Sequence, residues 1–299
     1  PDVVHSQCEF STFAPARRIA HAAGAPLIHT YHTVYEDYTH YFSPSRSMGR
    51  KMAALFTRMI CADCDAVIAP TPKISRLLAG YGVHCPVRII PTGLDLQRFA
   101  VPRDDALRSR LGLPPKEANK TVLLSLGRLA KEKNTTELVD SMKNLPDAVL
   151  LIVGEGPERA VLEQQAQSLG VADRVIFVGA VPPAEVPRYY ALGDVFVSAS
   201  TSEAQGLTYI EAMAAGLPLL CHADPCLDAL VREGETGWAY HTPAAALPKG
   251  HQLAAMRQNA RRAVQPYTKE QFGLSVVRLY AAALGRKHAA RSAARGNVA

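Results

Sequence analysis

The sequence contains no long apolar run and no arrangement of residues typical of a metal site. Its longest apolar stretches, such as residues 212–221, are too short to cross a bilayer. Cys61 and Cys64 have C-x-x-C spacing, but no second pair with zinc-finger spacing follows, and we find no cluster of aspartates. Because six cysteines occur without a secretory signal, we expect reduced, intracellular thiols, buried in the case of Cys61 and Cys64.

A strong excess of one charge is also missing from most of the chain. The formal net charge is +6, and residues 286–299 supply four of these charges without any acid: Arg286, Lys287, Arg291 and Arg295. The remainder is nearly neutral, which argues against nucleic acid as a partner. We expect residues 286–299 to be a disordered basic tail, either solvated or attracted to an anionic membrane surface.

Short apolar and β-branched runs are present, and each is followed by a helical pattern. With 48% hydrophobic and 20% charged residues, the chain has the composition of a folded globular protein. Continuous apolar runs that alternate with helices predict parallel sheets covered on both faces, so the fold class is α/β. The expected strands are residues 3–5, 27–30, 66–70, 87–91, 122–126, 149–153, 175–178, 195–198, 217–221 and 237–240.

The pattern predicts two Rossmann-like domains. Residues 100–120 are charged and proline-containing, which predicts a linker between residues 1–100 and residues 101–266. Only four strands precede the linker, and the first begins almost at residue 1. We therefore expect the first domain to be incomplete at its N-terminal side. Residues 241–251 have the low complexity of a linker.

Candidate site residues follow the expected strands, because ligands of open parallel sheets bind at the carboxyl ends of the strands. Arg128 and Lys133 lie between a strand and a helix that begins near Asn134, with Glu137 as a capping-box partner. Such cations suit phosphate, although an exposed basic loop is an equally good interpretation. Gly154 follows the next strand, where a tight turn is favoured over a ligand site.

Two carboxylates flank the start of a later helix. Glu203 precedes a helix expected from about Gly206 to Gly216, and Glu211 lies inside it. The backbone N–H groups at Gly206 and Leu207 would face an anion, while the carboxylates could accept from hydroxyls. A sugar nucleotide carries both groups. Acidic residues that merely favour the helix N-terminus are the alternative, which explains Glu203 weakly and Glu211 not at all.

In the first half, polar aromatic residues and carboxylates crowd the end of the strand at residues 27–30. His32 could donate to a substrate oxygen there, whereas backbone-satisfied histidines are the plain interpretation for His29 and His40. The next segment, residues 46–63, predicts a basic amphipathic helix. It lies either on an anionic membrane or, as the pattern alone favours, with its apolar residues in a core.

Together these motifs resemble the family-4 retaining glycosyltransferases of the GT-B fold, over residues 1 to about 284. The residues that carry the resemblance are EAQGLTYIE (203–211), GRLAKEKN (127–134), GEGP (154–157) and PTGLD (91–95). HSQCEFS (5–11), TYHTVYEDYTHY (30–41) and DPCLD (224–228) are similar to bacterial diacylglycerol glucosyltransferases of that family.

The resemblance implies transfer of glucose, with retention, from UDP-glucose to the 3-hydroxyl of diacylglycerol, without a metal or resident cofactor. By resemblance, Arg128 and Lys133 would neutralise the donor diphosphate, and Glu211 would bind the ribose. Glu203 and His32 would contact the donor sugar. The remaining implied contacts are Gly154, Gly206 and Leu207 for the donor, and Tyr35, Glu36 and Asp37 for the acceptor.

The resemblance also implies a cytoplasmic enzyme, peripheral on the inner face of the membrane, and a helix over residues 267–285 that returns to the first domain. UDP-galactose or another UDP-hexose stays open as donor, as does another lipid or glycan as acceptor. A truncated fragment that binds nucleotide without turnover is the non-catalytic alternative. A dehydrogenase is disfavoured because its glycine fingerprint with a following acidic residue is absent.

Overall fold

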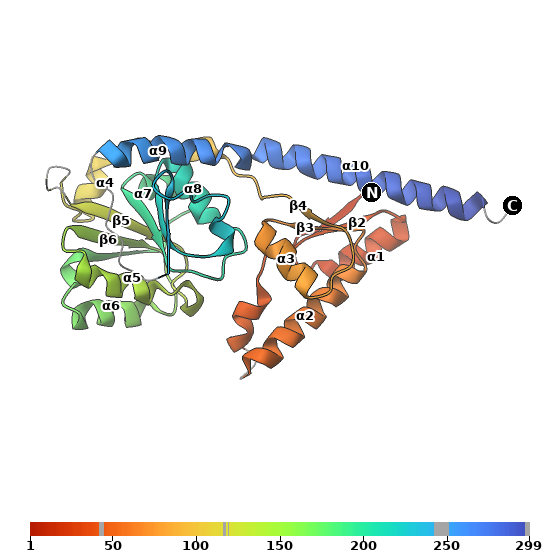
Figure 1. Cartoon of the computed structure of the whole chain (residues 1–299), viewed down its shortest axis with the longest axis horizontal. Coiled ribbons are helices and arrows are strands. Elements are labelled where there is room, and N and C mark those ends of the chain that lie inside the picture. The colour runs from red at the N-terminus through yellow and green to blue at the C-terminus, as the bar shows by residue number, and fades with distance from the viewer. Residues whose placement is uncertain (42–44, 116–117, 119, 242–250, 297–299) are drawn as a thin grey trace. The chain divides into compact units, whose positions relative to one another are not determined.

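The alternating strands and helices form two parallel sheets, each in its own unit (Figure 1). The computed structural model describes residues 1–41, 45–115, 118, 120–241 and 251–296. One unit comprises Pro1–Gly93 and Lys269–Ala299, and the other comprises Leu94–Thr268. The α/β class predicted from the apolar runs is therefore confirmed.

The first unit has a four-stranded parallel sheet of order β1-β2-β3-β4. Helix α10 covers one face of the sheet, where Val276, Leu279 and Ala283 pack on Ile28 and Ile68. In Figure 1, α10 lies above these strands, and α1, α2 and α3 lie below them. The elements are β1 (Val4–Ser6), α1 (Phe13–Ala23), β2 (Leu27–Thr30), η1 (Tyr35–Tyr41), α2 (Arg46–Ala62), β3 (Ala66–Ala69), α3 (Pro72–Gly80), β4 (Val87–Ile89) and α10 (Lys269–Gly296).

The second unit has a six-stranded parallel sheet of order β10-β9-β8-β5-β6-β7. The strand order reverses between β5 and β8, which pair through Leu123 with Val195 and Leu124 with Phe196. The crevice beside such a reversal, at the carboxyl ends of the strands, is where ligands of doubly wound sheets bind. The strands are β5 (Thr121–Leu126), β6 (Ala148–Val153), β7 (Val175–Gly179), β8 (Val195–Ser198), β9 (Leu219–His222) and β10 (Gly237–Tyr240).

Helices cover both faces of this second sheet, as its continuous apolar strands predict. Helices α5 and α6 pack on one face, and η2, α4, α7, α8 and α9 pack on the other (Figure 1). The helices are η2 (Leu96–Phe99), α4 (Asp105–Arg110), η4 (Lys131–Lys133), α5 (Thr135–Ser141), η5 (Met142–Asn144), α6 (Arg159–Ser168), η6 (Ala172–Arg174), α7 (Val186–Tyr190), α8 (Leu207–Ala215), η7 (Pro225–Leu227), α9 (His251–Ala263) and η8 (Gln265–Tyr267).

The structure differs from the sequence prediction at the expected linker, residues 100–120. Leu107 and Leu113 of this segment belong to the core of the second unit. Arg103 donates to Asp194 at 2.8 Å and fixes the segment on the sheet. The segment is thus part of the second unit, which begins at Leu94, because its two buried leucines anchor it to that core. Residues 116, 117 and 119 lie outside the described residues.

The prediction of a disordered tail is wrong for residues 286–296, which continue helix α10. Alanine, the best helix former, is abundant there, and Lys287 binds both carboxylate oxygens of Asp65 at 3.3 Å. The linker expected at residues 241–251 falls largely on residues 242–250, outside the described part of the chain. Within the described residues, no helix is both long and apolar enough to cross a bilayer.

Candidate functional site

The loops after β5 and β8 meet at the carboxyl edge of the second sheet, where the strand order reverses. Lys133, from the first loop, donates to Oε1 of Glu203, from the second loop, at 2.5 Å. Ser202 also donates to the Glu132 carbonyl at 3.4 Å. The side chains of Lys133 and Glu203 remain 27% and 17% exposed, so both can reach a ligand at this edge. Two residues predicted for donor binding are thereby brought together.

Helix α8 begins at the same edge and ends as predicted, between Gly206 and Gly216. Gly206 has φ 71°, and a Cβ there would lie 2.3 Å from the Tyr209 ring, so only glycine fits. The N–H groups of Leu207 and Thr208 occupy the first turn, where a helix offers them no acceptor. An anion beside Gly206 would therefore find free donors.

Glu211 lies one turn further along α8 and is held by a buried tyrosine of α7. The Tyr190 hydroxyl donates to Oε2 of Glu211 at 2.8 Å. Burial raises the pKa of Glu211, while the hydrogen bond from Tyr190 and the charge of Arg98 oppose that shift. The result is a half-buried carboxylate, Oε1 of which has no partner among the described residues.

Gly154 serves close packing between two loops. Its backbone N–H donates to the Gly179 carbonyl, and a Cβ there would lie 1.8 Å from the carbonyl oxygen of Gly127. Gly156 approaches Leu129 in the same way. The structure thus supports the tight-turn interpretation of the glycines, and ligand contact by Gly154 stays a prediction. Arg128, next to Gly127, is exposed, and its side chain has no partner in the described part of the chain.

A side-chain network fixes the loop carrying Lys133, and the sequence indicated only its Asn134–Glu137 part. Glu137 accepts from Asn134 Nδ2 at 2.7 Å, and its other oxygen lies 3.1 Å from His222 Nδ1. Tyr240 also contacts Glu137. The capping-box prediction is wrong in detail: Asn134 is left-handed, with φ 49°, and its side chain contacts that of Glu137 and no helix amide.

In the first unit, His32 lies at the carboxyl end of β2, and its Nε2 is 2.8 Å from Oε1 of Gln7. Part of the ring reaches solvent, and burial of the remainder lowers the pKa of His32. His5 bridges Thr30 and Tyr280 with 2.7 Å contacts at both ring nitrogens. Burial lowers the pKa of His5 to about 4. Both imidazoles are therefore neutral at pH 7.

Glu9 is a buried carboxylate of this region, and no sequence motif indicated its role. It lies 3.2 Å from Nε2 of His29 and accepts from the Tyr35 hydroxyl at 2.6 Å. Burial alone would raise the pKa of Glu9, but these hydrogen bonds outweigh it and hold the pKa below its ordinary value. His29 is side-chain-bonded, so the expected backbone partner is wrong. The side chain of His40 lies outside the described part of the chain.

The three predicted acceptor residues begin η1. The Tyr35 ring packs edge-on against Phe10 and Phe56, in addition to its bond to Glu9. Glu36 accepts from the Tyr81 hydroxyl at 3.0 Å and pairs with Arg50 at 3.2 Å. Asp37 lies beside it and is partly buried. The cluster is tied together by its own contacts, so an acceptor would meet a preformed surface.

The prediction of buried thiols is confirmed for Cys61 and Cys64, which are 1% and 7% exposed. The hydrogen bond with Cys85 raises the pKa of Cys61, with burial adding to the shift. Among the described residues, no group of three or more His, Cys, Asp or Glu side chains has the arrangement of a metal site.

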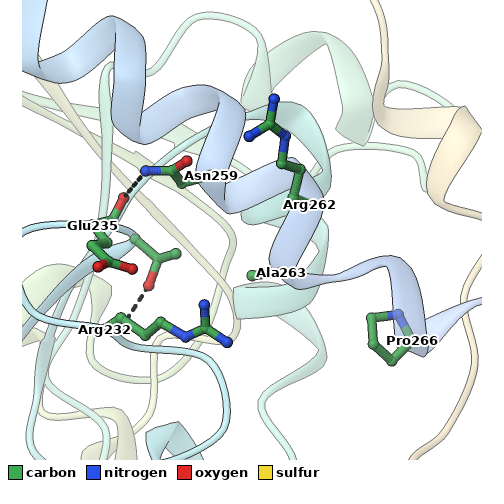
Figure 2. Close-up of a pocket in the computed structure, with 7 residues that line it drawn as sticks. Arg232, Glu235, Asn259, Arg262, Ala263 and Pro266 are labelled. Atoms are coloured by element: carbon green, nitrogen blue, oxygen red, sulfur yellow. Dashed lines mark hydrogen bonds between the residues drawn. The ribbon is translucent and has the colours of Figure 1, made fainter.

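A cavity of about 330 Å³ lies elsewhere, between the turn before β10 and the end of α9 (Figure 2). Asn259 closes one side by donating to the Glu235 carbonyl at 3.3 Å. Because β10 starts at Gly237, this cavity lies at the amino end of that strand. None of the predicted site residues lines it. Its lining residues are Arg232, Glu235, Thr236, Asn259, Arg262, Ala263 and Pro266.

The second unit has the fold of a doubly wound α/β domain, and sequence comparison defines the family. Residues 113–271 match the family described as "Glycosyl transferases group 1", and residues 1–98 match "Glycosyltransferase Family 4". The chain belongs to this family of glycosyltransferases.

Similar proteins include two α-monoglucosyldiacylglycerol synthases. The Streptococcus pneumoniae protein is 39% identical over 80% of this chain and 56% of its own length. The Acholeplasma laidlawii protein is 32% identical over 93% of this chain and 75% of its own length. The chain thus spans little more than half of the first relative.

Solved structures share the fold. The structure of Anabaena HepE in complex with UDP and glucose has a TM-score of 0.78 at 20% identity, over 94% of this chain and 78% of that one. Sucrose-phosphate synthase from Thermosynechococcus elongatus gives a TM-score of 0.77 at 26% identity, over 95% of this chain and 74% of that one. These neighbours confirm the GT-B fold predicted from the motifs.

Proposed function

We propose that the protein transfers glucose from UDP-glucose to the 3-hydroxyl of diacylglycerol with retention of the α-configuration. The observation that carries the proposal is the Lys133–Glu203 pair beside the free first turn of α8, at the reversal point of the second sheet. The names of two relatives, both synthases of α-monoglucosyldiacylglycerol, support the choice of glucose and of a diacylglycerol acceptor.

Donor binding follows from the charges at the sheet edge. Lys133 exchanges its contact with Glu203 for the donor diphosphate, and exposed Arg128 adds a planar guanidinium. Glu203 then accepts from hydroxyls of the glucose. Gly206 and Leu207 offer backbone N–H groups, and Glu211 accepts from the ribose. In this proposal protein cations supply the positive charge at the diphosphate, so it includes neither a metal ion nor a resident cofactor.

The transfer step mainly requires stabilisation of the negative charge on the departing diphosphate. The bond between C1 of glucose and the phosphate oxygen breaks, and a bond from C1 to the glycerol oxygen forms on the same face. The proton of the acceptor hydroxyl passes to the departing phosphate oxygen, so UDP leaves as product. Arg128 and Lys133 stabilise the charge that develops there. Neutral His32 contacts the sugar as a hydrogen-bonding group, because its lowered pKa keeps it uncharged at pH 7.

The acceptor side belongs to the first unit. Glu36 and Asp37 offer carboxylates to the glycerol hydroxyl, while Tyr35, whose hydroxyl is occupied by Glu9, contributes its ring. Phe10 stacks on Phe56 at 5.4 Å and still exposes 67% of its surface. Exposed aromatic surface next to carboxylates suits a lipid with a hydroxyl head.

Helix α2 would bind to an anionic membrane surface. We propose that this surface is the inner face of the cell membrane. Its large apolar residues Met48, Met52, Leu55 and Met59, hereafter the α2 stripe, are 60%, 51%, 51% and 63% exposed. The core-facing side carries the smaller residues Ala53, Thr57 and Cys61. The interpretation of α2 as a helix with its large apolar residues in a core is therefore wrong for these four, whereas Phe56 is half-buried against Phe10 and Tyr35. The helix contains no acidic residue, so it complements anionic lipid.

The function is tested by incubating the protein with UDP-glucose and vesicles that contain diacylglycerol. We expect an α-linked monoglucosyl product, identified by the anomeric coupling in its NMR spectrum, and at least 100-fold slower formation by Arg128→Ala. UDP-galactose and soluble glycans serve as competing substrates in the same assay. Bound UDP-glucose without product, or a preferred glycan product, would contradict the proposed reaction, as would full turnover by Arg128→Ala.

A further inference from the structure

Tyr190 is a buried hydroxyl group aimed at a predicted ligand-binding carboxylate. Its side chain is 0% exposed and its ring lies 5.7 Å from Phe99 and 6.0 Å from Phe196, centroid to centroid. The hydroxyl lies 2.8 Å from Oε2 of Glu211 and 3.3 Å from the Thr208 carbonyl oxygen. Because aromatic packing fixes the ring, the hydroxyl holds one oxygen of Glu211 in place.

We propose that Tyr190 is a positioning residue for nucleotide recognition: it holds Oε2 of Glu211 so that Oε1 accepts from a ribose hydroxyl. The inference rests on the proposed function, which assigns Glu211 to the ribose. The hydrogen bond orients the carboxylate and also stabilises its charged form. Tyr190 itself does not touch the donor, because its side chain is fully buried.

The other charged groups near Glu211 do not orient its carboxylate, so this role falls to Tyr190. Burial raises the pKa of the carboxyl group, and the opposing contributions come from Tyr190 and from Arg98 of η2. Arg98 is exposed and donates to the Pro183 carbonyl. From α9, Arg257 is held by Asp194 at 3.0 Å, and Arg261 donates to the Ala215 carbonyl at 3.0 Å. Among the described residues, Tyr190 is thus the only side chain that donates a hydrogen bond to Glu211.

Calorimetric titration with UDP, 2′-deoxy-UDP and 3′-deoxy-UDP tests the proposal without requiring turnover. We expect Tyr190→Phe to bind UDP roughly tenfold more weakly than the wild type, as for a lost hydrogen bond to a charged group. It should also lose most of the preference for UDP over the deoxy analogue whose hydroxyl Glu211 binds. Tyr189→Phe, at the neighbouring buried tyrosine, is the matched control and should retain both properties.

Two further readouts separate positioning from packing. In the Glu211→Gln background, Tyr190→Phe should weaken UDP binding by no more than a further factor of about two, because the two residues act as one unit. In the single variant, the loss of UDP affinity should grow as pH falls, since removing the hydrogen bond raises the pKa of Glu211 further. If Tyr190→Phe only disturbed packing, its loss of affinity would be the same in the Glu211→Gln background as in the wild type. It would also be the same for all three nucleotides.

The outcomes distinguish this inference from the proposed function. If Glu211→Gln weakens UDP binding while Tyr190→Phe leaves affinity and ribose preference unchanged, the positioning role is overturned and the donor site stands. If Glu211→Gln also leaves UDP binding unchanged, the assignment of Glu211 to the ribose fails, and the proposed donor site fails with it.

Discussion

At the scale of single residues, the sequence predicted which polar side chains lie at the strand ends. It did not predict which residues form hydrogen bonds with them. Lys133 and Glu203 each follow a strand of a parallel sheet, so their meeting at one edge follows from sequence. Tyr190 and Glu9 were missed, because a buried hydroxyl or carboxylate gains its role from a neighbour distant in sequence. Glu211, for example, lies 21 positions from Tyr190.

His5 illustrates a residue-scale consequence for stability. Burial lowers its folded-state pKa from 6.5 to about 4, so the unfolded chain binds a proton first as pH falls. Stability from this group is therefore complete above pH 6.5 and is lost as pH falls toward 4. Urea unfolding between these pH values should show that the free energy of unfolding falls less steeply with decreasing pH for His5→Gln than for the wild type.

His84→Gln provides the control for this measurement, because His84 is exposed. It should follow the wild-type pH dependence. If His5→Gln does so as well, protonation of His5 does not contribute to acid destabilisation.

At the scale of elements, the strand predictions were accurate and the helix faces were not. The predicted strands at residues 27–30, 195–198 and 237–240 match β2, β8 and β10 in both bounds. Helix α2 was placed correctly, but its periodicity alone could not tell which side meets the core. The buried side carries the small residues Ala53 and Thr57, whereas the outward side carries Met48, Met52, Leu55 and Met59.

Flotation with vesicles of phosphatidylcholine and phosphatidylglycerol tests the α2 stripe. Each apolar side chain that leaves water contributes about 1.5–3 kcal/mol, so Met52→Glu and Leu55→Glu should each weaken binding by roughly tenfold or more. Reversing the exposed cations with Lys51→Glu and Arg58→Glu should abolish the preference for anionic vesicles.

Val161→Glu, which replaces an equally exposed apolar residue on α6, is the matched control and should bind vesicles like the wild type. Equal binding by the wild type and all of these variants, or no binding by the wild type, would exclude α2 as the membrane contact.

At the scale of the whole molecule, the two α/β units were predictable from the alternation of apolar runs and helices. Their boundaries were not, because the charged, proline-containing appearance of residues 100–113 hides Leu107 and Leu113, which join the second core. The C-terminal residues likewise seemed a solvated tail by charge, whereas alanine content and the contact with Asp65 extend α10 to Gly296. Charge patterns thus gave a wrong prediction of irregular structure wherever a few apolar or alanine residues were enough to order a segment.

The central claim is that the carboxyl edge between β5 and β8 is the donor site, and calorimetric titration of UDP and UDP-glucose tests it most directly. We predict that Lys133→Ala weakens both ligands by at least tenfold, because it removes charge from the diphosphate site. Glu203→Ala should instead retain UDP affinity and lose the preference for UDP-glucose over UDP. Unchanged affinities of both variants for both ligands would contradict the account.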